Sequence, residues 1–208
     1  MARRDWFRHA QWDAAVEADF EAHLRRARDK VQPLKIQASI LADAFPEVAL
    51  RLIDRYFATG DTLFLADAFL TQARARVRLS DIPGALQSYE AGLAREAEFP
   101  GLKTNSFVEY PLLVAEHALS DRYDSALHVL SLRRTDVRFP VQGFMWLAAR
   151  ALILHAVGQP QQARSDAHEA LVSAEASASG FPYHRSLGLV GTSFDNLRER
   201  LRGLLADS

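Results

Sequence analysis

The segment VRLSDIPGALQSYEAGL, residues 77–93, carries the pattern that decides the fold. A helical stretch ends near Asp81, a Pro-Gly pair follows, and Ala85 and Tyr89 then lie four residues apart. A small residue lets two antiparallel helices approach closely, and a large residue one turn later fills the space beside it. The segment therefore predicts a helical hairpin whose helices meet at Ala85.

The pattern recurs three more times along the chain. Segments 41–57, 118–134 and 155–171 fit the same frame, each with an alanine at the anchoring position. The four anchoring residues, Ala49, Ala85, Ala126 and Ala163, are separated by 36, 41 and 37 residues. Since a period of roughly 20 to 50 residues is typical of repeat architectures, the spacing predicts four helical hairpins in series.

A second marker, the dipeptide Phe-Pro, recurs at residues 99–100, 139–140 and 181–182. Proline disfavours the α conformation in the residue that precedes it. Each Phe-Pro is therefore expected to end one hairpin and to start the crossing to the next.

Helical periodicity dominates the chain, and no useful length alternates as a strand would. The sequence therefore predicts an all-α protein of about ten helices. The expected helices lie near residues 11–29, 31–43, 46–58, 62–79, 83–97, 105–120, 122–134, 141–157, 160–176 and 190–206. We expect a single domain over 1–208, with an N-terminal capping helix within 1–30, four hairpins over 31–176 and a C-terminal capping helix at 189–206.

Composition and charge restrict the function classes. The 208 residues are 49% hydrophobic and 25% charged with a net charge of −1, as in ordinary globular proteins. This charge provides no global field for nucleic acid, and the absence of cysteine excludes disulfides, thiolate catalysis and cysteine-based zinc sites. The start MARRDWFRHAQWD lacks the apolar stretch of a secretory signal, and the apolar run at 146–157 is too short for a bilayer. We therefore expect a cytoplasmic protein without membrane contact.

The hairpin pattern resembles the tetratricopeptide repeat (TPR), which has a small residue in its first helix and A-x3-F in its second. Ala85 and Tyr89 match the second-helix pair, and Ala73 and Ala151 match the small first-helix residue. The resemblance covers roughly residues 31–176. It implies a right-handed superhelical stack of antiparallel helical hairpins, a TPR-like α-solenoid in which neighbouring hairpins cover each other's apolar faces.

The chain also departs from the repeat in spacing and in residue type. The usual period is about 34 residues, and Gln37 and Val114 replace the small first-helix residue in two copies. These departures fit either a divergent member of the family or a convergent stack of helical hairpins.

In this family, ligands usually lie on the concave surface lined by the first helix of each pair. Carried over by register, that face includes Ala38 and Asp67 and gives ten partner-binding candidates: Leu34, Leu41, Leu70, Arg74, Arg78, Val108, Leu112, Met145, Leu152 and His155. Two interpretations of this mostly apolar face stay open. It is either core, covered by Trp6 and Phe7 or by segment 177–188, or an open groove for a hydrophobic peptide, helix or small ligand.

The polar candidates suggest an anchor for an anion. Arg74 and Arg78 are four residues apart and share a helix face, so together with His155 they could hold the polar end of a partner through forked hydrogen bonds. The alternative is a solvated arginine face that pairs with Asp67 or Asp81.

The two ends of the chain carry apolar groups with two interpretations each. Trp6, Phe7 and Trp12 are expected to staple the N-terminus onto the first hairpin, although aromatic residues also serve interfaces. The last helix presents an apolar stripe, which is expected to cap the stack and could instead pair with a second copy in a homodimer. The stripe consists of Phe194, Leu197, Leu201 and Leu204.

Catalytic motifs are missing from the sequence. HEALV at 168–172 lacks the second histidine of a zinc protease, and GLVGTSFD at 188–195 lacks the lysine of a phosphate-binding loop. We therefore expect a non-catalytic protein–protein interaction module without cofactor or metal, of adaptor, chaperone or toxin-immunity type, that binds a protein or peptide partner. One alternative is a small-ligand sensor or enzyme with a pocket near Tyr110, Arg150 and His155. Another is nucleic-acid binding through arginine clusters such as 133–138, which we do not expect because acidic residues interrupt them.

Overall fold

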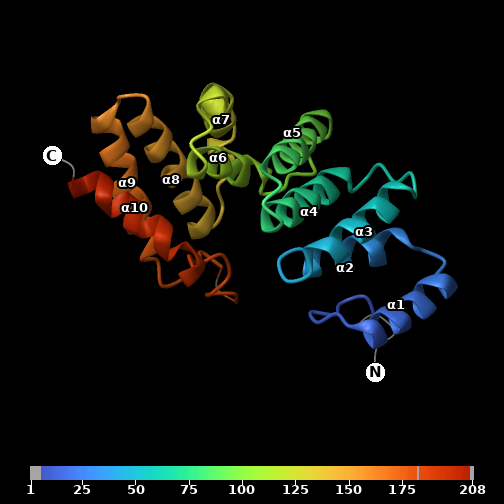
Figure 1. The fold of residues 1–208 in the computed structure, drawn as a ribbon. Helices are drawn as coiled ribbons and strands as arrows, with labels where there is room; N and C mark the ends of the chain where they lie inside the picture. The colour runs from blue at the N-terminus through green and yellow to red at the C-terminus, as the bar shows by residue number, and fades with distance from the viewer. Residues whose placement is uncertain (1–5, 182, 207–208) are drawn as a thin grey trace. The chain divides into compact units, whose positions relative to one another are not determined.

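The computed structural model describes residues 6–181 and 183–206, and the described residues form helices and connecting loops with no strand (Figure 1). The prediction of an all-α protein of ten helices is therefore confirmed. The helices are α1 (Ala14–Arg26), α2 (Val31–Leu41), α3 (Pro46–Phe57), α4 (Leu65–Arg78), α5 (Ile82–Glu98), α6 (Ser106–Glu116), α7 (Tyr123–Leu132), α8 (Pro140–Ala156), α9 (Pro160–Ala174) and α10 (Asp195–Ala206). Short 3₁₀ turns lie at Ser120–Arg122, Arg134–Asp136 and Thr192–Phe194.

The helices begin where the sequence offers caps. Asp13 Oδ1 accepts hydrogen bonds from the amides of Ala15 and Val16 at the start of α1, both at 2.9 Å. Asp81 accepts from the Gly84 amide at the start of α5. Each bond satisfies a backbone donor that has no partner within its helix.

The Phe-Pro pairs do not all have the predicted role. Phe99 caps the C-terminal end of α5, as expected. Phe139 instead precedes α8, and Pro140 is its first residue, so this pair starts a hairpin directly. The physical reason is that the fixed φ of proline suits the first turn of a helix, where its missing N–H is not needed. Of the third pair, Pro182 lies outside the described residues.

The chain divides into two compact units between Ser106 and Phe107. The first unit contains α1 to α5, and the second contains α6 from Phe107 onward and α7 to α10. A single domain over 1–208 stays a prediction.

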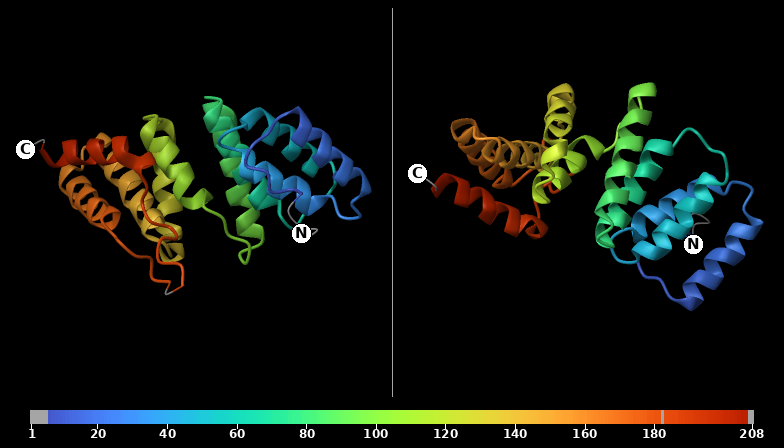
Figure 2. Two further views of the ribbon diagram at one scale, coloured as in Figure 1. Left: turned by 90° about the horizontal axis from the view of Figure 1, so that it is seen from below. Right: turned by 45° about the horizontal axis from the view of Figure 1, so that its top comes forward.

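In the first unit, helices pack in chain order. The pairs α2/α3 and α4/α5 are hairpins, and the first hairpin contacts the second through α3 against α4 and α2 against α4 (Figures 1 and 2). The positions predicted to lie at the hairpin contacts are buried. Eight positions are at most 1% exposed: Ala49, Ala85, Ala126 and Ala163 in the second helices, and Gln37, Ala73, Val114 and Ala151 in the first helices.

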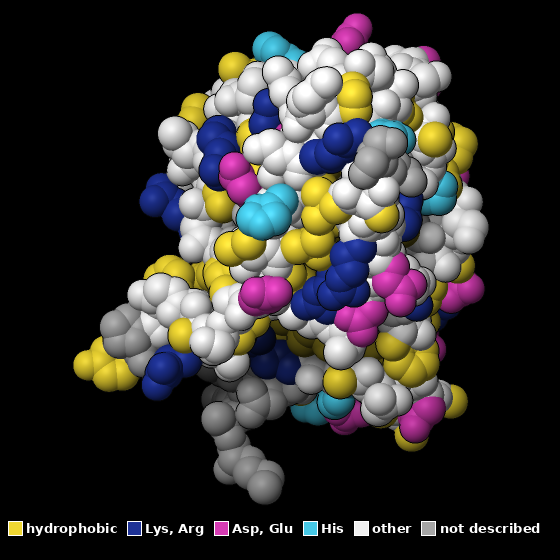
Figure 3. Space-filling view, turned by 90° about the vertical axis from the view of Figure 1, so that its left-hand side faces the viewer, with side chains coloured by type: hydrophobic (Ala, Val, Ile, Leu, Met, Phe, Trp, Pro, Cys, Tyr) yellow, Lys and Arg dark blue, Asp and Glu magenta, His cyan; other side chains and the backbone are white. Residues whose placement is uncertain are grey.

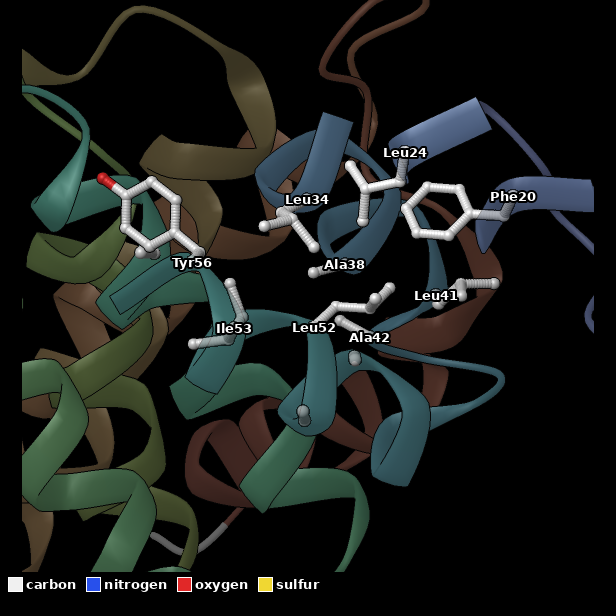
Figure 4. Close-up of a cluster of buried hydrophobic side chains, with 12 residues drawn as sticks. Phe20, Leu24, Leu34, Ala38, Leu41, Ala42, Leu52, Ile53 and Tyr56 are labelled. Carbon is white, nitrogen blue, oxygen red and sulfur yellow. The ribbon is translucent and has the colours of Figure 1, made fainter. Parts of the chain in front are cut away.

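The core of the first unit joins α1, α2 and α3. Figure 4 shows Leu34, Ala38 and Leu41 of α2 in one cluster with Phe20 and Leu24 of α1, and the cluster continues into α3. The aromatic residues of the N-terminal part pack against the same cluster: Trp6, Phe7 and Trp12. They therefore staple the chain onto the first hairpin, as predicted.

In the second unit, α8 and α9 form a hairpin and α10 packs against both (Figure 2). The α10 leucines of the predicted stripe, Leu197, Leu201 and Leu204, are buried. The Phe194 ring meets the Phe144 ring edge-on, with centroids 5.4 Å apart. The stripe is thus used within the chain, and pairing with a second copy stays a prediction. No helix among the described residues has both the length and the apolar character required to span a membrane.

Candidate functional site

A cavity of about 450 Å³ opens between α2 and α4 in the first unit. These are the first helices of the two hairpins, where the family resemblance places ligands. The lining comes from four segments of the chain: Arg8 before α1; Lys35, Ile36, Ser39 and Ile40 of α2; Asp67, Leu70, Thr71 and Arg74 of α4; and Thr104 and Asn105 after α5.

Cationic side chains outnumber acidic ones among the described residues that line the cavity. Three cationic side chains line it, those of Arg8, Lys35 and Arg74, and Asp67 is the single acidic residue among the described lining residues. Lys35 Nζ lies 2.8 Å from Asp67 Oδ2 and 4.5 Å from the centre of the Phe64 ring, and the Lys35 side chain is only 14% exposed. Lys35 and Asp67 are therefore paired with each other within the lining.

Polar and apolar groups both complete the cavity. Ser39, Thr71, Thr104 and Asn105 add hydroxyl and amide groups to the lining. The Thr104 hydroxyl already donates to Glu96 Oε1. Thr71 Oγ1 already donates to the Asp67 carbonyl at 2.9 Å. The apolar part of the wall consists of Ile36, Ile40 and Leu70. A ligand with an anionic group and apolar side chains would match this mixture.

Three of the four residues predicted for the concave face of α4 line the cavity, whereas the apolar residues predicted for that face of α2 lie in the core. Leu70, Arg74 and Asp67 line the cavity, whereas Leu34 and Leu41, 3% and 0% exposed, lie in the core. The reason is that this face of α2 is covered by α1 and by the N-terminal aromatic residues. The neighbouring face of α2 lines the cavity in its place, with Lys35, Ile36, Ser39 and Ile40.

A signal for the α2 orientation was present in the sequence. Leu34, Ala38 and Leu41 form an apolar stripe, whereas Lys35 and Ser39 are polar neighbours on the adjoining face. A polar face is the one that normally meets solvent. The family's ligand-binding positions correspond to the apolar stripe of α2, but the polar residues beside the stripe indicate which face of α2 is exposed.

The second arginine of the predicted pair has a different surrounding. Arg78 is exposed, and its Nε donates to the Asp43 carbonyl at 3.3 Å. It is not among the residues that line the cavity. The interaction with Asp81 is made by Arg76, with 3.8 Å between Arg76 Nε and Asp81 Oδ2. Of the two predicted arginines, Arg74 therefore lines the cavity and Arg78 does not.

The candidates of the second unit are mostly buried. Val108, Leu112 and Met145 are buried, Leu152 is half-buried, and His155 is exposed near the end of α8. These residues therefore do not present the continuous apolar surface that an open groove requires.

The residues of the small-ligand alternative each have a protein partner or face solvent. Arg150 Nη1 lies 2.9 Å from Asp166 Oδ1, so the anion beside Arg150 is a carboxylate of its own chain. The Tyr110 hydroxyl forms a hydrogen bond of 2.8 Å with the Ser125 hydroxyl, and His155 is exposed.

Two arginines of the cluster at 133–138 make contacts within the chain. Arg133 pairs with Asp136, and the Arg134 guanidinium lies over the Trp146 ring, 4.7 Å from its centre. Figure 3 shows one face of the molecule, on which basic side chains alternate with acidic and apolar ones. Within the described part of the chain, no three His, Asp or Glu side chains lie close enough together to hold a metal ion.

No protein-family model matches the chain. Comparison with curated proteins and with solved structures likewise finds no match.

Proposed function

We propose that this protein is a non-catalytic protein–protein interaction module that binds an acidic peptide segment of a partner in the cavity between α2 and α4. The observation that supports this proposal most directly is the charge of the lining. Arg8 and Arg74 face a cavity in which the described acidic residue, Asp67, is already paired with Lys35. An anionic side chain or a carboxylate placed there would meet more cationic than acidic side chains among the described lining residues.

The family resemblance supports a peptide rather than a small ion as the ligand. In the proposed architecture, a right-handed superhelical stack of TPR-like hairpins, the first helices form a concave surface along which an extended segment lies. The chain-order packing of α2 to α5 and the buried anchors of all four hairpins support that architecture. A segment of several residues would also reach the apolar wall of Ile36, Ile40 and Leu70.

Typical interaction free energies indicate which contacts would supply the affinity. An exposed ion pair contributes only about 0.2–1 kcal/mol, so two arginines alone give weak binding. Burial of an apolar side chain contributes about 1.5–3 kcal/mol. We therefore expect the apolar contacts to supply most of the affinity, and the arginines to supply orientation, association rate and salt dependence.

The experiment is a screen of a peptide library for binding, followed by a comparison of variants on the selected peptides. Arg74→Glu should weaken binding severalfold and reduce its salt dependence, whereas Asp67→Asn, which frees Lys35, should strengthen binding severalfold. Arg28→Glu makes the same charge change at an exposed residue outside the cavity lining and should have little effect. Selected peptides that lack acidic residues, or equal affinity for the Arg74→Glu and Arg28→Glu variants, would contradict the proposal.

A further inference from the structure

A smaller pocket, here called the side pocket, lies next to the candidate site in the first unit. It has a volume of about 100 Å³ and is lined by Leu63, Phe64, Asp67, Leu102, Lys103 and Thr104. Two of these residues, Asp67 and Thr104, also line the cavity between α2 and α4. The two cavities therefore adjoin, and a peptide bound in the larger one can reach the smaller one.

The side pocket exposes two leucine side chains to solvent. Leu63 is 54% exposed and Leu102 is 36% exposed. Leu63 precedes α4 and Leu102 follows α5, yet both line the same pocket together with Phe64. Single exposed apolar residues are common on protein surfaces. Apolar side chains that gather from separate segments around a concave pocket are instead typical of a binding site.

Arg95 of α5 joins the two segments that form the walls of the side pocket. Its Nη2 donates to the carbonyl of Thr62, the residue before Leu63, at 2.7 Å. Its guanidinium also lies over the Phe99 ring, 3.7 Å from the ring centre. The Phe99 carbonyl in turn accepts the Leu102 amide at 2.9 Å. Through these contacts the segments that carry the two exposed leucines are tied to each other.

Further hydrogen bonds fix the backbone of both walls. The Phe64 amide donates to Asp61 Oδ2 at 3.1 Å. The Thr104 amide donates at 3.0 Å to Oε1 of Glu96, a residue that is only 2% exposed. A pocket whose walls are already fixed loses less conformational entropy when a ligand group enters it. The side pocket is therefore formed before a ligand binds.

The size and lining of the side pocket limit the group that it can accept. An apolar cavity of about 150 Å³ holds a benzene molecule, so a pocket of about 100 Å³ suits an aliphatic side chain such as that of leucine. The side chains of Leu63, Phe64 and Leu102 favour an apolar group, because burial of a charged group without partners is costly.

We infer that the side pocket accepts one aliphatic side chain of the acidic peptide that binds between α2 and α4. This inference rests on the proposed function, and it adds the residue class by which the partner is selected, namely a leucine, isoleucine or methionine with acidic residues beside it. Leu63 and Leu102 contact this side chain and supply affinity because apolar surface is buried between them and the ligand.

The experiment measures binding of two short fluorescein-labelled peptides to the full chain. Both peptides have glutamate and serine residues around one central residue, which is Leu in the first peptide and Ala in the second. The side-pocket variants are Leu63→Ser and Leu102→Ser, and Ile40→Ser changes the apolar wall of the larger cavity instead. The matched control is Leu79→Ser, since Leu79 is 38% exposed and is not among the residues that line either cavity. Circular dichroism and a melting curve establish that each variant is folded at the assay temperature.

The wild-type chain should bind the Leu peptide about tenfold more tightly than the Ala peptide, as expected when part of a buried apolar side chain is removed. Leu63→Ser and Leu102→Ser should each reduce this ratio to about threefold or less, because only the Leu peptide reaches the changed residue. Ile40→Ser should weaken both peptides by the same factor and keep the ratio, and Leu79→Ser should leave both affinities unchanged.

The possible failures of the inference and of the proposed function are distinct. If the wild-type chain binds both peptides equally, or if the ratio persists in Leu63→Ser and Leu102→Ser, then the role of the side pocket is wrong and the proposed function stands. If neither peptide binds, or if Gln in place of every Glu leaves binding of the Leu peptide unchanged, the proposed function fails and the inference fails with it.

Discussion

Gln37 and His9, 28 residues apart in the sequence, are joined by two hydrogen bonds in which a buried side-chain amide pairs with both backbone polar groups of one residue. This pairing ties the segment before α1 to the middle of α2. It explains how a polar residue is accommodated at a fully buried position of a helical hairpin.

Replacement of Gln37 by Met should destabilise the first unit by about 1–3 kcal/mol. The change leaves the N–H and C=O of His9 without their partners, and an unsatisfied polar group carries a cost of that size. Urea unfolding followed by tryptophan fluorescence measures the loss, since Trp6 and Trp12 lie against the affected core. Gln87→Met, at an exposed position of α5, is the matched control and should change the free energy of unfolding little.

Replacement of Tyr56 by Phe tests a second buried polar contact in the first unit. The Tyr56 hydroxyl donates to Asp61 Oδ2 at 2.5 Å, and the same carboxylate oxygen accepts from the Phe64 amide at 3.1 Å. Loss of the hydroxyl should reduce the free energy of unfolding by about 1–3 kcal/mol, as for a hydrogen bond to a charged group. Tyr183→Phe, at a residue that is 94% exposed, should be neutral in the same assay.

The Tyr56 phenol should also remain protonated while the chain is folded. Burial, and then the Asp61 carboxylate, raise the pKa of Tyr56 well above its ordinary value of 10.0. Because the folded state holds this proton more tightly than the unfolded state, stability should fall as the pH rises above 10. An absorbance titration that shows every tyrosine ionising near pH 10 without unfolding would contradict this expectation.

The Asp166 carboxyl should make stability depend on pH in the direction opposite to that of an ordinary salt bridge. Burial raises the pKa of Asp166 above 3.8, and the Arg150 guanidinium lowers it by less. Asp166 Oδ2 has no hydrogen-bond partner, although Oδ1 pairs with Arg150. The folded state therefore binds the proton more tightly, and this group's contribution to stability falls as the pH rises from 3.8 through the folded-state pKa.

The comparison with Asp166→Asn isolates that contribution. The variant has no proton to bind at this position, so the wild-type chain should lose stability relative to it as the pH rises through that window. Urea unfolding of both chains at a series of pH values gives the difference at each point. If the wild-type chain instead gains stability relative to Asp166→Asn as the pH rises, attraction to Arg150 affects the pKa of Asp166 more than burial does.

Replacement of Gly188 by Ala should destabilise the second unit by more than the strain of a left-handed backbone at an alanine. Gly188 has φ of +71°, and an added Cβ would come within 2.6 Å of the Phe139 side chain. The Gly188 carbonyl also accepts the Val141 amide at 2.8 Å, which fixes the loop on the start of α8. Gly60→Ala is the matched control, with φ of +73° and open space around the added carbon.

The control should cost about 1–2 kcal/mol from backbone strain, and Gly188→Ala should cost more because the Phe139 ring must move. Phe139 is stacked on Phe181 with ring centres 5.2 Å apart, so that movement also disturbs a second aromatic residue. Chemical unfolding of both variants measures the two losses. Equal losses would show that the ring adjusts freely.

The order of the helices and the pairing of α2 with α3, α4 with α5 and α8 with α9 were predictable from the sequence. Helix formation follows local features, namely apolar periodicity, the caps Asp13 and Asp81, and small residues such as Ala85 where two helices approach closely. A hairpin joins neighbours in the chain, so the residues that decide its contact lie within one short segment. For this reason the four anchoring alanines were identified correctly as buried positions.

Which face of α2 meets the cavity was decided only by the tertiary structure. Successive residues of an α-helix are about 100° apart around its axis, so Leu34 and Lys35 face different neighbours although they are adjacent in the chain. Leu34 turns toward the core because α1 and the segment around Trp6 cover that side, and Lys35 is thereby left at the cavity with Arg8. The sequence alone determined that α2 is a helix with one apolar face. The contacts made by distant segments determined what covers that face, and therefore which residues form the candidate site.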